Sequence, residues 1–444
     1  MIRTFRVRRA VVSAVFIPAV LPALLRAQQP AVASRFVGEW VGTLATPAAK
    51  LRLGLSVARD ASSGGLTGVL TSLDQGNAKI PATLALHGDT LVVSMPAAQA
   101  TYTAVLDAAK DSLRGTFTQG APLPLDMGRS SPPTAPVRPQ EPKPPFPYSS
   151  RDVTVESVPG VRLAGTILMP PGAGPFPAVV MVTGSGPQNR NEELLGHKPF
   201  LVIADYLARH GIASLRYDDR GIAASTGNFA ASTSADFADD AQAAVAFLRK
   251  QPGIAPGHVG IIGHSEGGLI APMVAARDTS VAFIVLLAGP GLPGDSILLL
   301  QGELIAKANN APQAMIDTNL AVNSRLFAAV KGARDSADAA ARVNAIADRM
   351  TASLPVTQQA QARTQLETVK AQVLAPWMQY FLKYDPRTAL RQVRVPVLAL
   401  DGSLDLQVPP KADLAAIDTT LKRAGNRDYE VKELPGLNHL FQTA

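Results

Sequence analysis

Cysteine is absent from the 444-residue chain, and this absence excludes several kinds of chemistry. Without a thiol the protein forms no disulfide, no thiolate metal site, no cysteine nucleophile and no lipidated N-terminal cysteine. A chain free of thiols also suits an oxidising compartment, where an unpaired cysteine is a liability. Covalent catalysis in this protein therefore requires a different nucleophile.

The formal net charge is +7, but most of this excess lies in one short segment. Residues 1–27 hold five arginines and no acidic residue, so removing these five charges from +7 leaves +2. No cluster of lysine and arginine interleaved with aromatic residues occurs, and we therefore expect no nucleic acid partner. With 47% hydrophobic and 17% charged residues, the chain has a globular composition and is long enough for two or three domains.

The N-terminal segment predicts export. It reads "MIRTFRVRRAVVSAVFIPAVLPALLRAQQP", in which four arginines precede an apolar run over residues 10–25 that contains two prolines. A run this short and interrupted is typical of a secretory signal peptide rather than a membrane anchor. We predict a signal peptide over residues 1–27, cleaved after Ala27 or Ala33. The protein would then be periplasmic or extracellular, without stable membrane insertion after cleavage.

Residues 34–128 carry short strand patterns separated by turn signals. In "KLRLGLSVAR" apolar side chains recur at every second position, and "TGVLTSL", "DTLVVSM", "TYTAVL" and "SLRGTF" follow. This spacing predicts a small antiparallel barrel or sandwich without a catalytic constellation, in which His87 is a turn residue. Eight prolines between Pro132 and Pro147 then predict a semi-rigid extended linker over residues 129–147.

From residue 148 to residue 444 the pattern changes to strands that alternate with helices. The segments "PAVVMVTG", "IASLRYDDRG", "VGIIGHS", "VAFIVLLAG" and "VPVLALDG" are near-continuous apolar runs. Strands buried on both faces of a parallel sheet have this pattern, so we predict an α/β domain with a doubly wound, mostly parallel sheet. Residues 295–393 show helical periods and no strand signal. We interpret them as a helical cap over a site at the carboxyl edge of the sheet.

The sharpest motif is "GHSEGG" at residues 263–268. Gly-x-Ser-x-Gly alone is a weak signal, but here the apolar strand "VGII" runs into it and the helical segment "EGGLIAPMVAA" follows. The glycines avoid collisions with neighbouring backbone in a tight strand-to-helix turn that presents the serine hydroxyl. Ser265 is therefore the candidate nucleophile, and it needs a base and a third group that orients the base.

His439 is the candidate base. It follows the last strand signal, "DYEVKELPG", on a loop at the carboxyl edge, where a base meets a nucleophile presented from the same edge. His197, in "NEELLGHKPF", is an alternative residue of the pocket. His264 adjoins the serine, but its side chain should point elsewhere, and we interpret His210 and His258 as structural.

The candidate acid lies in "VPVLALDGSLDLQVPP", which offers two aspartates. Asp401 ends the strand, and its carboxylate could simply brace the turn at Gly402. Asp405 reaches farther along the loop toward the histidine. We therefore favour Asp405 as the group that orients the base.

Two backbone donors are expected for an oxyanion. One is the N–H of Glu266, directly after the nucleophile, and the other lies in "VTGSGPQNRNE", at Ser185 or Gly186. That segment lacks the longer glycine pattern of a dinucleotide-binding loop and does not open a helix. In "RYDDRG", residues 218–220 suggest an internal salt bridge beside the site more than a metal site. We expect neither a metal nor an organic cofactor.

The motifs taken in order resemble a known family. They are "RPQEPKPPFPY", "GSGPQNRNEE", "GHKPF", "RYDDRG", "GHSEGGLIAPM", "LAGPG", "DLQVP" and "LPGLNHLFQ". Together they resemble bacterial secreted α/β-hydrolases of the carboxylesterase type, related to the dienelactone-hydrolase and prolyl-oligopeptidase branches. The resemblance implies an esterase for small acyl esters, often with a β-rich N-terminal domain. Its triad falls on Ser265, Asp405 and His439, in the chain order of that fold.

One departure from the family concerns the end of the chain. Family members continue past the histidine loop into a further helix, whereas this sequence ends at Ala444. We therefore expect apolar sheet surface to be exposed and the loop that carries His439 to be weakly held.

The sequence thus predicts a secreted serine carboxylesterase that hydrolyses small-molecule esters through an acyl-enzyme intermediate. Two alternatives stay open. One is a serine peptidase of the prolyl-oligopeptidase-like type, whose cap screens short peptides. The other is a non-catalytic binding protein.

Overall fold

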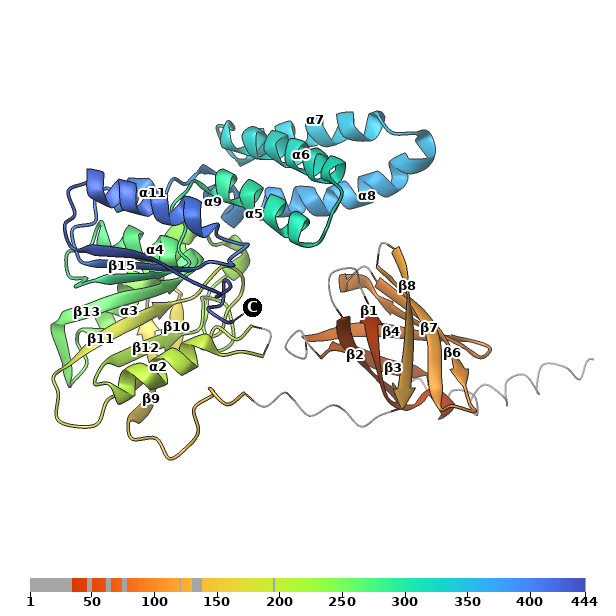
Figure 1. Ribbon diagram of the computed structural model, residues 1–444, viewed down its shortest axis with the longest axis horizontal. Coiled ribbons are helices and arrows are strands. Elements are labelled where there is room, and N and C mark those ends of the chain that lie inside the picture. Colours follow the sequence, from red (N-terminus) through yellow and green to blue (C-terminus); the bar gives the residue numbers. More distant parts are fainter. Residues whose placement is uncertain are drawn as a thin grey trace, which may run out of the picture. The chain divides into compact units, whose positions relative to one another are not determined.

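The computed structural model describes residues 34–45, 50–60, 65–73, 78–98, 100–119, 121–129, 138–194 and 196–443. The predicted signal peptide lies outside the described residues, as do residues 130–137 of the predicted linker. The chain folds into two compact units, the first ending at Ala135 and the second beginning at Pro136 (Figure 1). The division falls within the proline-rich segment.

The first unit is a closed barrel of antiparallel strands, in which each strand pairs with the next and β8 pairs with β1. Its strands are β1 (Gly38–Ala45), β2 (Lys50–Arg59), β3 (Leu66–Ser72), β4 (Ala78–His87), β5 (Thr90–Met95), β6 (Ala100–Asp107), β7 (Ser112–Gln119) and β8 (Ala121–Arg129). A short 3-10 helix, η1 (Pro96–Ala98), joins β5 to β6. Because β1 and β8 close the ring, the region is a barrel and not a sandwich. His87 was interpreted as a turn residue but is the last residue of β4, paired with Thr90 of β5, and the turn itself consists of Gly88 and Asp89.

Alternating side chains fill the barrel interior. In β5 every second residue is buried, as the two-residue period of a strand requires. Trp40 and Tyr102 are fully buried, and their polar atoms are paired. The Trp40 indole N–H donates to the Phe36 carbonyl at 2.8 Å, and the Tyr102 hydroxyl donates to the Leu125 carbonyl at 3.0 Å. The barrel is therefore held by a packed apolar core with satisfied polar groups.

The second unit contains an eight-stranded sheet in the order β16-β15-β14-β13-β11-β12-β10-β9. Its strands are β9 (Ser149–Glu156), β10 (Arg162–Met169), β11 (Phe176–Val182), β12 (Ala213–Tyr217), β13 (Ile254–His264), β14 (Ile284–Leu287), β15 (Val397–Gly402) and β16 (Tyr429–Leu434). β9 and β10 are antiparallel to their neighbours, and the remaining pairs are parallel. The predicted α/β fold with a mostly parallel sheet is therefore correct.

Helices cover both faces of this sheet. On one face lie α3 (Ser234–Leu248), α4 (Glu266–Ala275) and α11 (Pro410–Arg423), whose small and branched side chains share one core with the strands. α2 (Pro199–Arg209) packs on the opposite face, where Phe200 and Ala204 contact a second core. On that second face of β14 and β15, Val285, Leu287 and Leu398 are only partly buried.

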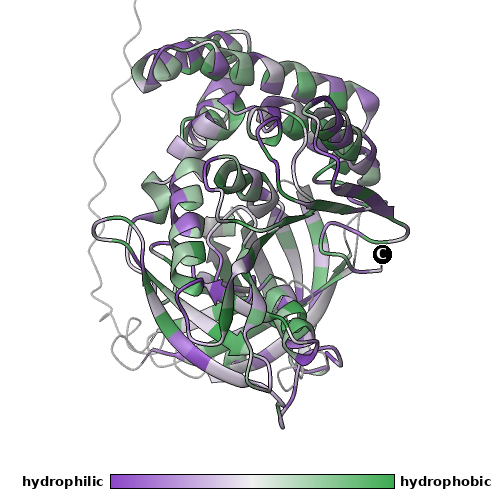
Figure 2. Ribbon diagram, turned by 90° about the vertical axis from the view of Figure 1, so that its left-hand side faces the viewer, coloured by the Kyte–Doolittle hydropathy of each residue, from purple (hydrophilic) through white to green (hydrophobic). Residues whose placement is uncertain are grey.

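Five helices are inserted between β14 and β15, where the sequence predicted a helical segment. They are α5 (Gly294–Ala308), α6 (Gln313–Lys331), α7 (Ser336–Ala352), α8 (Val356–Val373) and α9 (Pro376–Lys383), and the short α10 (Arg387–Leu390) follows. The inserted helices stand on the side of α4 and α11 (Figure 1). Their surfaces alternate between hydrophilic and hydrophobic residues, whereas the central strands are mainly hydrophobic (Figure 2). A small core that includes Leu326, Val330 and Leu382 holds them together.

Within the described ranges, we find no helix with both the length and the hydropathy that a bilayer span needs.

Close backbone packing at the end of β13 generates a first prediction. A Cβ at Gly263 would lie 2.0 Å from the Gly267 carbonyl oxygen, whereas a Cβ at Gly257, in the same strand, would meet nothing within 4 Å. Gly263→Ala should therefore lower the free energy of unfolding by about 1–3 kcal/mol, the usual cost of overpacking. Thermal denaturation measures this loss. Gly257→Ala is the matched control, and equal melting temperatures for the two variants would contradict the expectation.

Candidate active site

Ser265 occupies a strained turn between β13 and α4. Its φ is 52° and its ψ is −115°, which places a non-glycine residue in the left-handed region. The turn is fixed at both sides, because the Ser265 amide donates to the Leu287 carbonyl at 2.8 Å and its carbonyl accepts from the Gly268 amide at 2.9 Å. Strain of this kind persists where the surrounding structure over-determines it, and it presents the serine hydroxyl at the sheet edge.

The segment that follows β11 lies directly beside this serine. A Cβ built on Gly184 would stand 3.2 Å from the Ser265 Cβ, and a Cβ on Gly267 would stand 2.1 Å from the Val182 carbonyl oxygen. Glycine at both positions therefore lets the segment and the first turn of α4 meet without a side chain between them. This places the two regions predicted to supply oxyanion donors next to each other.

Asp405 and His439 are joined by a short hydrogen bond. The distance between Asp405 Oδ2 and His439 Nδ1 is 2.6 Å, and both side chains are buried. Asp405 Oδ1 also accepts from the amides of Gln407 at 2.6 Å and Val408 at 2.9 Å. Burial alone would raise the pKa of Asp405, but the hydrogen bond and charge of His439 and these two amides lower it below its ordinary value. Asp405 is thus an ionised carboxylate aimed at the imidazole.

The loop that carries His439 is firmly held, so the expectation of a weakly held loop was wrong. His264 Nε2 lies 2.9 Å from the His439 carbonyl oxygen, and the two rings have centroids 4.8 Å apart. The Asn438 side chain accepts from the amides of Leu440 and Gln442, each at 3.0 Å. The loop is therefore fixed by a hydrogen bond with His264 at the end of β13 and by hydrogen bonds within itself.

His264 immediately precedes Ser265. Its contact with the His439 carbonyl therefore links the loop of the candidate base to the turn of the candidate nucleophile. Among the described residues, no hydrogen bond joins the Ser265 hydroxyl to the His439 ring. Such bonds are often long or poorly aligned in free enzymes and tighten when substrate binds.

Asp401, the rejected alternative, lies behind Asp405 and does not contact His439. It is 1% exposed, and its Oδ1 accepts from the Gly402 amide at 2.8 Å. Burial and the charge of Asp405 raise the pKa of Asp401 well above its ordinary value. Burial and the nearby charge of Asp405 thus work against a negative charge on Asp401, whose Oδ2 has no hydrogen-bond partner among the described residues.

The predicted oxyanion donors are available. Within the described part of the chain, the amides of Glu266, Ser185 and Gly186 donate to no protein acceptor. The Gly184 amide is engaged, since it donates to Glu192 Oε1 at 2.7 Å. A φ of +91° at Gly186 turns the backbone there in a way that favours glycine.

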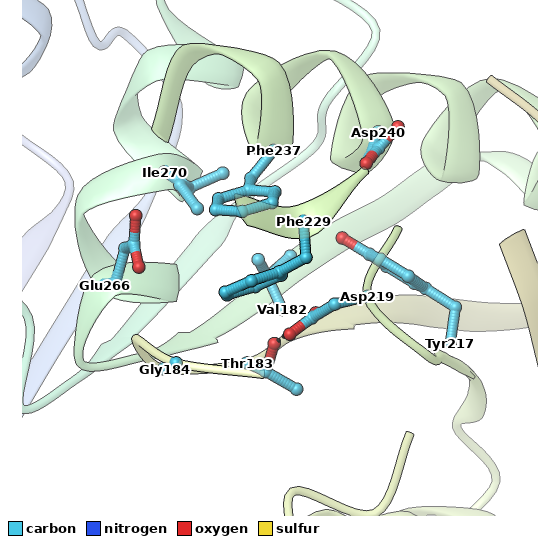
Figure 3. A pocket seen from close by; sticks show the side chains of 11 residues that line it. Val182, Thr183, Gly184, Tyr217, Asp219, Phe229, Phe237, Asp240, Glu266 and Ile270 are labelled. Carbon is cyan, nitrogen blue, oxygen red and sulfur yellow. Dashed lines mark hydrogen bonds between the residues drawn. The ribbon is translucent and has the colours of Figure 1, made fainter. Parts of the chain in front are cut away.

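A pocket opens beside Gly184, Gly186 and Glu266. It is lined by Val182, Thr183, Gly184, Gly186, Tyr217, Asp219, Phe229, Phe237, Asp240, Glu266 and Ile270. In Figure 3 the rings of Phe229 and Phe237 lie together in the middle, with the carboxyl group of Glu266 on one side and Tyr217 on the other. The two phenylalanine rings stack with centroids 5.4 Å apart.

The carboxyl groups of the pocket are buried and hydrogen-bonded. Burial raises the pKa of Asp219 to about 7, although the Thr183 hydroxyl and the Gln188 amide act in the opposite direction. Burial also raises the pKa of Glu266, whose Oε1 accepts from the Ser234 hydroxyl and the Trp377 indole N–H, both at 2.6 Å. Trp377 belongs to α9, so the helical insertion contacts the residue directly after Ser265.

Asp218 and Arg220 form ion pairs, but with partners outside the motif, whereas Asp219 accepts from the Thr183 hydroxyl and the Gln188 amide. Asp218 pairs with Arg190 at 2.8 Å, and Arg220 pairs with Asp240 at 2.6 Å.

The remaining histidines of this unit make no hydrogen bond with Asp405 or His439 among the described residues. The ring of His197 contacts the Arg138 guanidinium at 2.7 Å, and burial together with this charge lowers its pKa. His210 closes α2, with Nδ1 2.7 Å from the Tyr206 carbonyl oxygen, and His258 is exposed on β13. Glu192 and Trp377 were not predicted from the sequence. No local pattern distinguishes Glu192 from Glu193, and none indicates that Trp377 contacts the residue after Ser265.

The two aspartates should differ in their effect on turnover. Asp405→Asn should lower kcat for an aryl ester by about 10³- to 10⁴-fold, because an amide cannot stabilise the imidazolium or fix its tautomer. Asp401→Asn should stay within about threefold of the parent enzyme, since the Asn carbonyl oxygen can still accept from the Gly402 amide and Asp401 makes no hydrogen bond with His439. Steady-state kinetics on both variants measure this contrast. A larger loss in Asp401→Asn than in Asp405→Asn would reverse the assignment.

The raised pKa of Asp401 also predicts a pH effect on stability. Its folded pKa lies above the unfolded value near 4, so its stabilising contribution is fully present below about pH 4 and is lost as pH rises toward the folded pKa. Asp401→Asn removes this titration. The melting temperature of the variant, relative to the parent, should therefore be higher at pH 8 than at pH 5. The same offset at both pH values would show that Asp401 does not titrate with folding.

Three comparisons relate this chain to known proteins. It is 32% identical over 151 residues to esterase EstD of Thermotoga maritima, which is 34% of this chain, and it spans only 35% of the length of that relative. Among solved structures it is similar to the α/β hydrolase GrgF of Penicillium sp. sh18, with 17% identity, 66% of this chain and 91% of that chain covered, and a TM-score of 0.43. It is also similar to Est1E of Butyrivibrio proteoclasticus with bound ferulic acid, with 15% identity, 65% and 92% covered, and a TM-score of 0.42.

The family comparison covers the region that holds Ser265 and Asp405. The model of the S15 family, described as X-Pro dipeptidyl-peptidase, matches residues 159–416, which is more than half of the chain. The strand-to-helix turn at Ser265 lies near the middle of this region. The chain therefore belongs to the X-Pro dipeptidyl-peptidase (S15) family.

Proposed function

We propose that the protein is a carboxylesterase that hydrolyses small acyl esters through an acyl-enzyme intermediate. The observation that carries this proposal is the 2.6 Å hydrogen bond between Asp405 and His439, next to a serine held in a strained turn. An ionised carboxylate at Nδ1 fixes the tautomer of the histidine, which leaves Nε2 as the base.

In the first half of the reaction, Ser265 Oγ attacks the ester carbonyl while His439 takes its proton. The same histidine returns the proton to the leaving alcohol, and Asp405 stabilises the imidazolium that exists between the two transfers. The N–H of Glu266, with that of Ser185 or Gly186, stabilises the tetrahedral oxyanion. In the second half, His439 deprotonates a water molecule that attacks the acyl-enzyme, which releases the acid and restores the serine.

The pocket beside the nucleophile supports an uncharged acyl group. Phe229 and Phe237 give apolar contact, and Asp240 is neutralised by Arg220. The raised pKa values of Asp219 and Glu266 show that burial works against a negative charge on either group. The walls therefore offer apolar surface and hydrogen bonds, which is the usual character of a small-molecule site. The Trp377 contact supports the inserted helices as a cap over this pocket.

Peptidase activity is the second candidate, and the S15 family match favours it. A substrate ammonium group would favour ionisation of Glu266 or Asp219, because a nearby positive charge stabilises a carboxylate. The same pocket would then accept the N-terminal residue of a short peptide. Parallel rates on an aryl acetate and on an aminoacyl-prolyl anilide separate the two candidates. The non-catalytic alternative is not retained, since the family is one of enzymes.

Ser265→Ala tests the nucleophile. It should lower turnover of a short-chain aryl ester by at least about 10³-fold and abolish labelling by a fluorophosphonate, because no other hydroxyl occupies the turn. The assays are ester hydrolysis and gel detection of the labelled protein. Ser353→Ala, at the exposed end of α7, is the control and should leave both unchanged. Full hydrolysis or labelling by Ser265→Ala would overturn the proposal.

A further inference from the structure

Glu192 is a buried carboxylate that contacts two parts of the candidate site. It is 2% exposed, and its backbone adopts a left-handed φ of 52°. Its Oε1 accepts from the Gly184 amide at 2.7 Å and lies 2.8 Å from His264 Nδ1. A non-glycine residue in this conformation is held there by its surroundings, and here its carboxylate links the oxyanion segment to the residue before the nucleophile.

His264 continues this chain of contacts to the loop of the base. Its Nε2 lies 2.9 Å from the His439 carbonyl oxygen, so each ring nitrogen faces an oxygen that can only accept. A neutral imidazole has one N–H and would satisfy only one of them, whereas an imidazolium donates to both. Burial alone would lower the pKa of His264, but the charge and hydrogen bond of Glu192 and the His439 carbonyl raise it above its ordinary value. The contact geometry and the direction of this shift agree on a charged ring.

We propose that Glu192 and His264 form a positioning ion pair that fixes the oxyanion segment at Gly184 and the backbone of His439 relative to Ser265. The inference rests on the proposed function, because it assigns these two residues to the support of that triad. Neither side chain is assigned a contact with substrate. They act by holding the atoms that do.

The charge of Glu192 also affects proton transfer to His439, the candidate base. The His264 and His439 rings have centroids 4.8 Å apart, so an uncompensated charge on His264 would repel the imidazolium that His439 forms during the reaction. The charged and titratable groups that face His264 are Glu192, Asp405 and His439. With Glu192 ionised, the pair is neutral overall, and His264 can donate two hydrogen bonds without opposing proton transfer to His439.

Glu192→Gln tests the ion pair, because it replaces one carboxylate oxygen by an NH2 group and so removes the negative charge. The amide oxygen still accepts from the Gly184 amide, but the negative charge that keeps His264 protonated is gone. As pH rises, His264 should therefore lose its second proton, and with it the hydrogen bond to the His439 carbonyl, at a lower pH than in the parent. We expect kcat for a short-chain aryl ester to fall by about 10- to 100-fold with KM nearly unchanged, the usual effect of removing a group that orients a reacting residue. The alkaline limb of the kcat profile should also move to lower pH.

Glu193→Gln is the matched control. It removes the same charge from the next residue, whose side chain is exposed, and should leave kcat and the pH profile unchanged. An unchanged kcat and alkaline limb in Glu192→Gln would overturn the proposal. Equal losses in both variants would also overturn it, since they would show a general effect of charge.

His264→Asn keeps the test decisive if Glu192→Gln does not fold. Asn can replace the Nδ1 donor toward Glu192 but cannot reach the His439 carbonyl, so its kcat should fall to a similar extent. The rate constant for phosphonylation of Ser265 by a fluorophosphonate should fall in parallel for either variant, because that reaction needs the triad but no particular substrate. Parent-like phosphonylation in a folded variant would refute the positioning role. Failure of the parent protein itself to react would instead refute the proposed function.

Discussion

Close backbone approach at the turn around Ser265 is the constraint on which the rest of the site depends. A Cβ at Gly268 would lie 2.6 Å from the Gly289 Cα, and those at Gly263 and Gly267 would overlap carbonyl groups. The closest approaches between β13, α4, the end of β14 and the segment after β11 therefore occur at glycines. This packing keeps the serine in a conformation that an isolated peptide would leave, and it sets the position of the amides around it.

Parallel pairing brings the other candidate residues to the same edge. β13, β14, β15 and β16 are adjacent and parallel, so their carboxyl ends lie side by side. Asp405 follows β15 and His439 follows β16. Buried charge at this edge is balanced locally, because Asp405 faces His439, Glu192 faces His264 and Asp401 stays neutral. Such pairing makes it possible to bury so many titratable groups in one place.

Much of the fold and part of the site were predictable from the sequence. Apolar runs gave the parallel strands, and glycine spacing gave the turn at Ser265, because both patterns are local. The choice of Asp405 over Asp401 was also accessible, since it followed from position relative to the strand end. The expectation that the His439 loop is weakly held was wrong. It considered only packing against a further helix, and no local sequence pattern reveals the hydrogen bond between His264 and the His439 carbonyl, which are 175 residues apart.

By itself, then, the sequence determined the order of strands and helices, the strand-to-helix turn and the residue types able to perform acyl transfer. Only the tertiary structure decided which partners these residues have. It placed Glu192, rather than Glu193, against His264, and brought Trp377 of the inserted helices to Glu266. Local patterns arise from the period of the backbone and the conformational limits of glycine and proline. Contacts between distant segments depend on sheet order and on burial, which emerge only when the whole unit has packed.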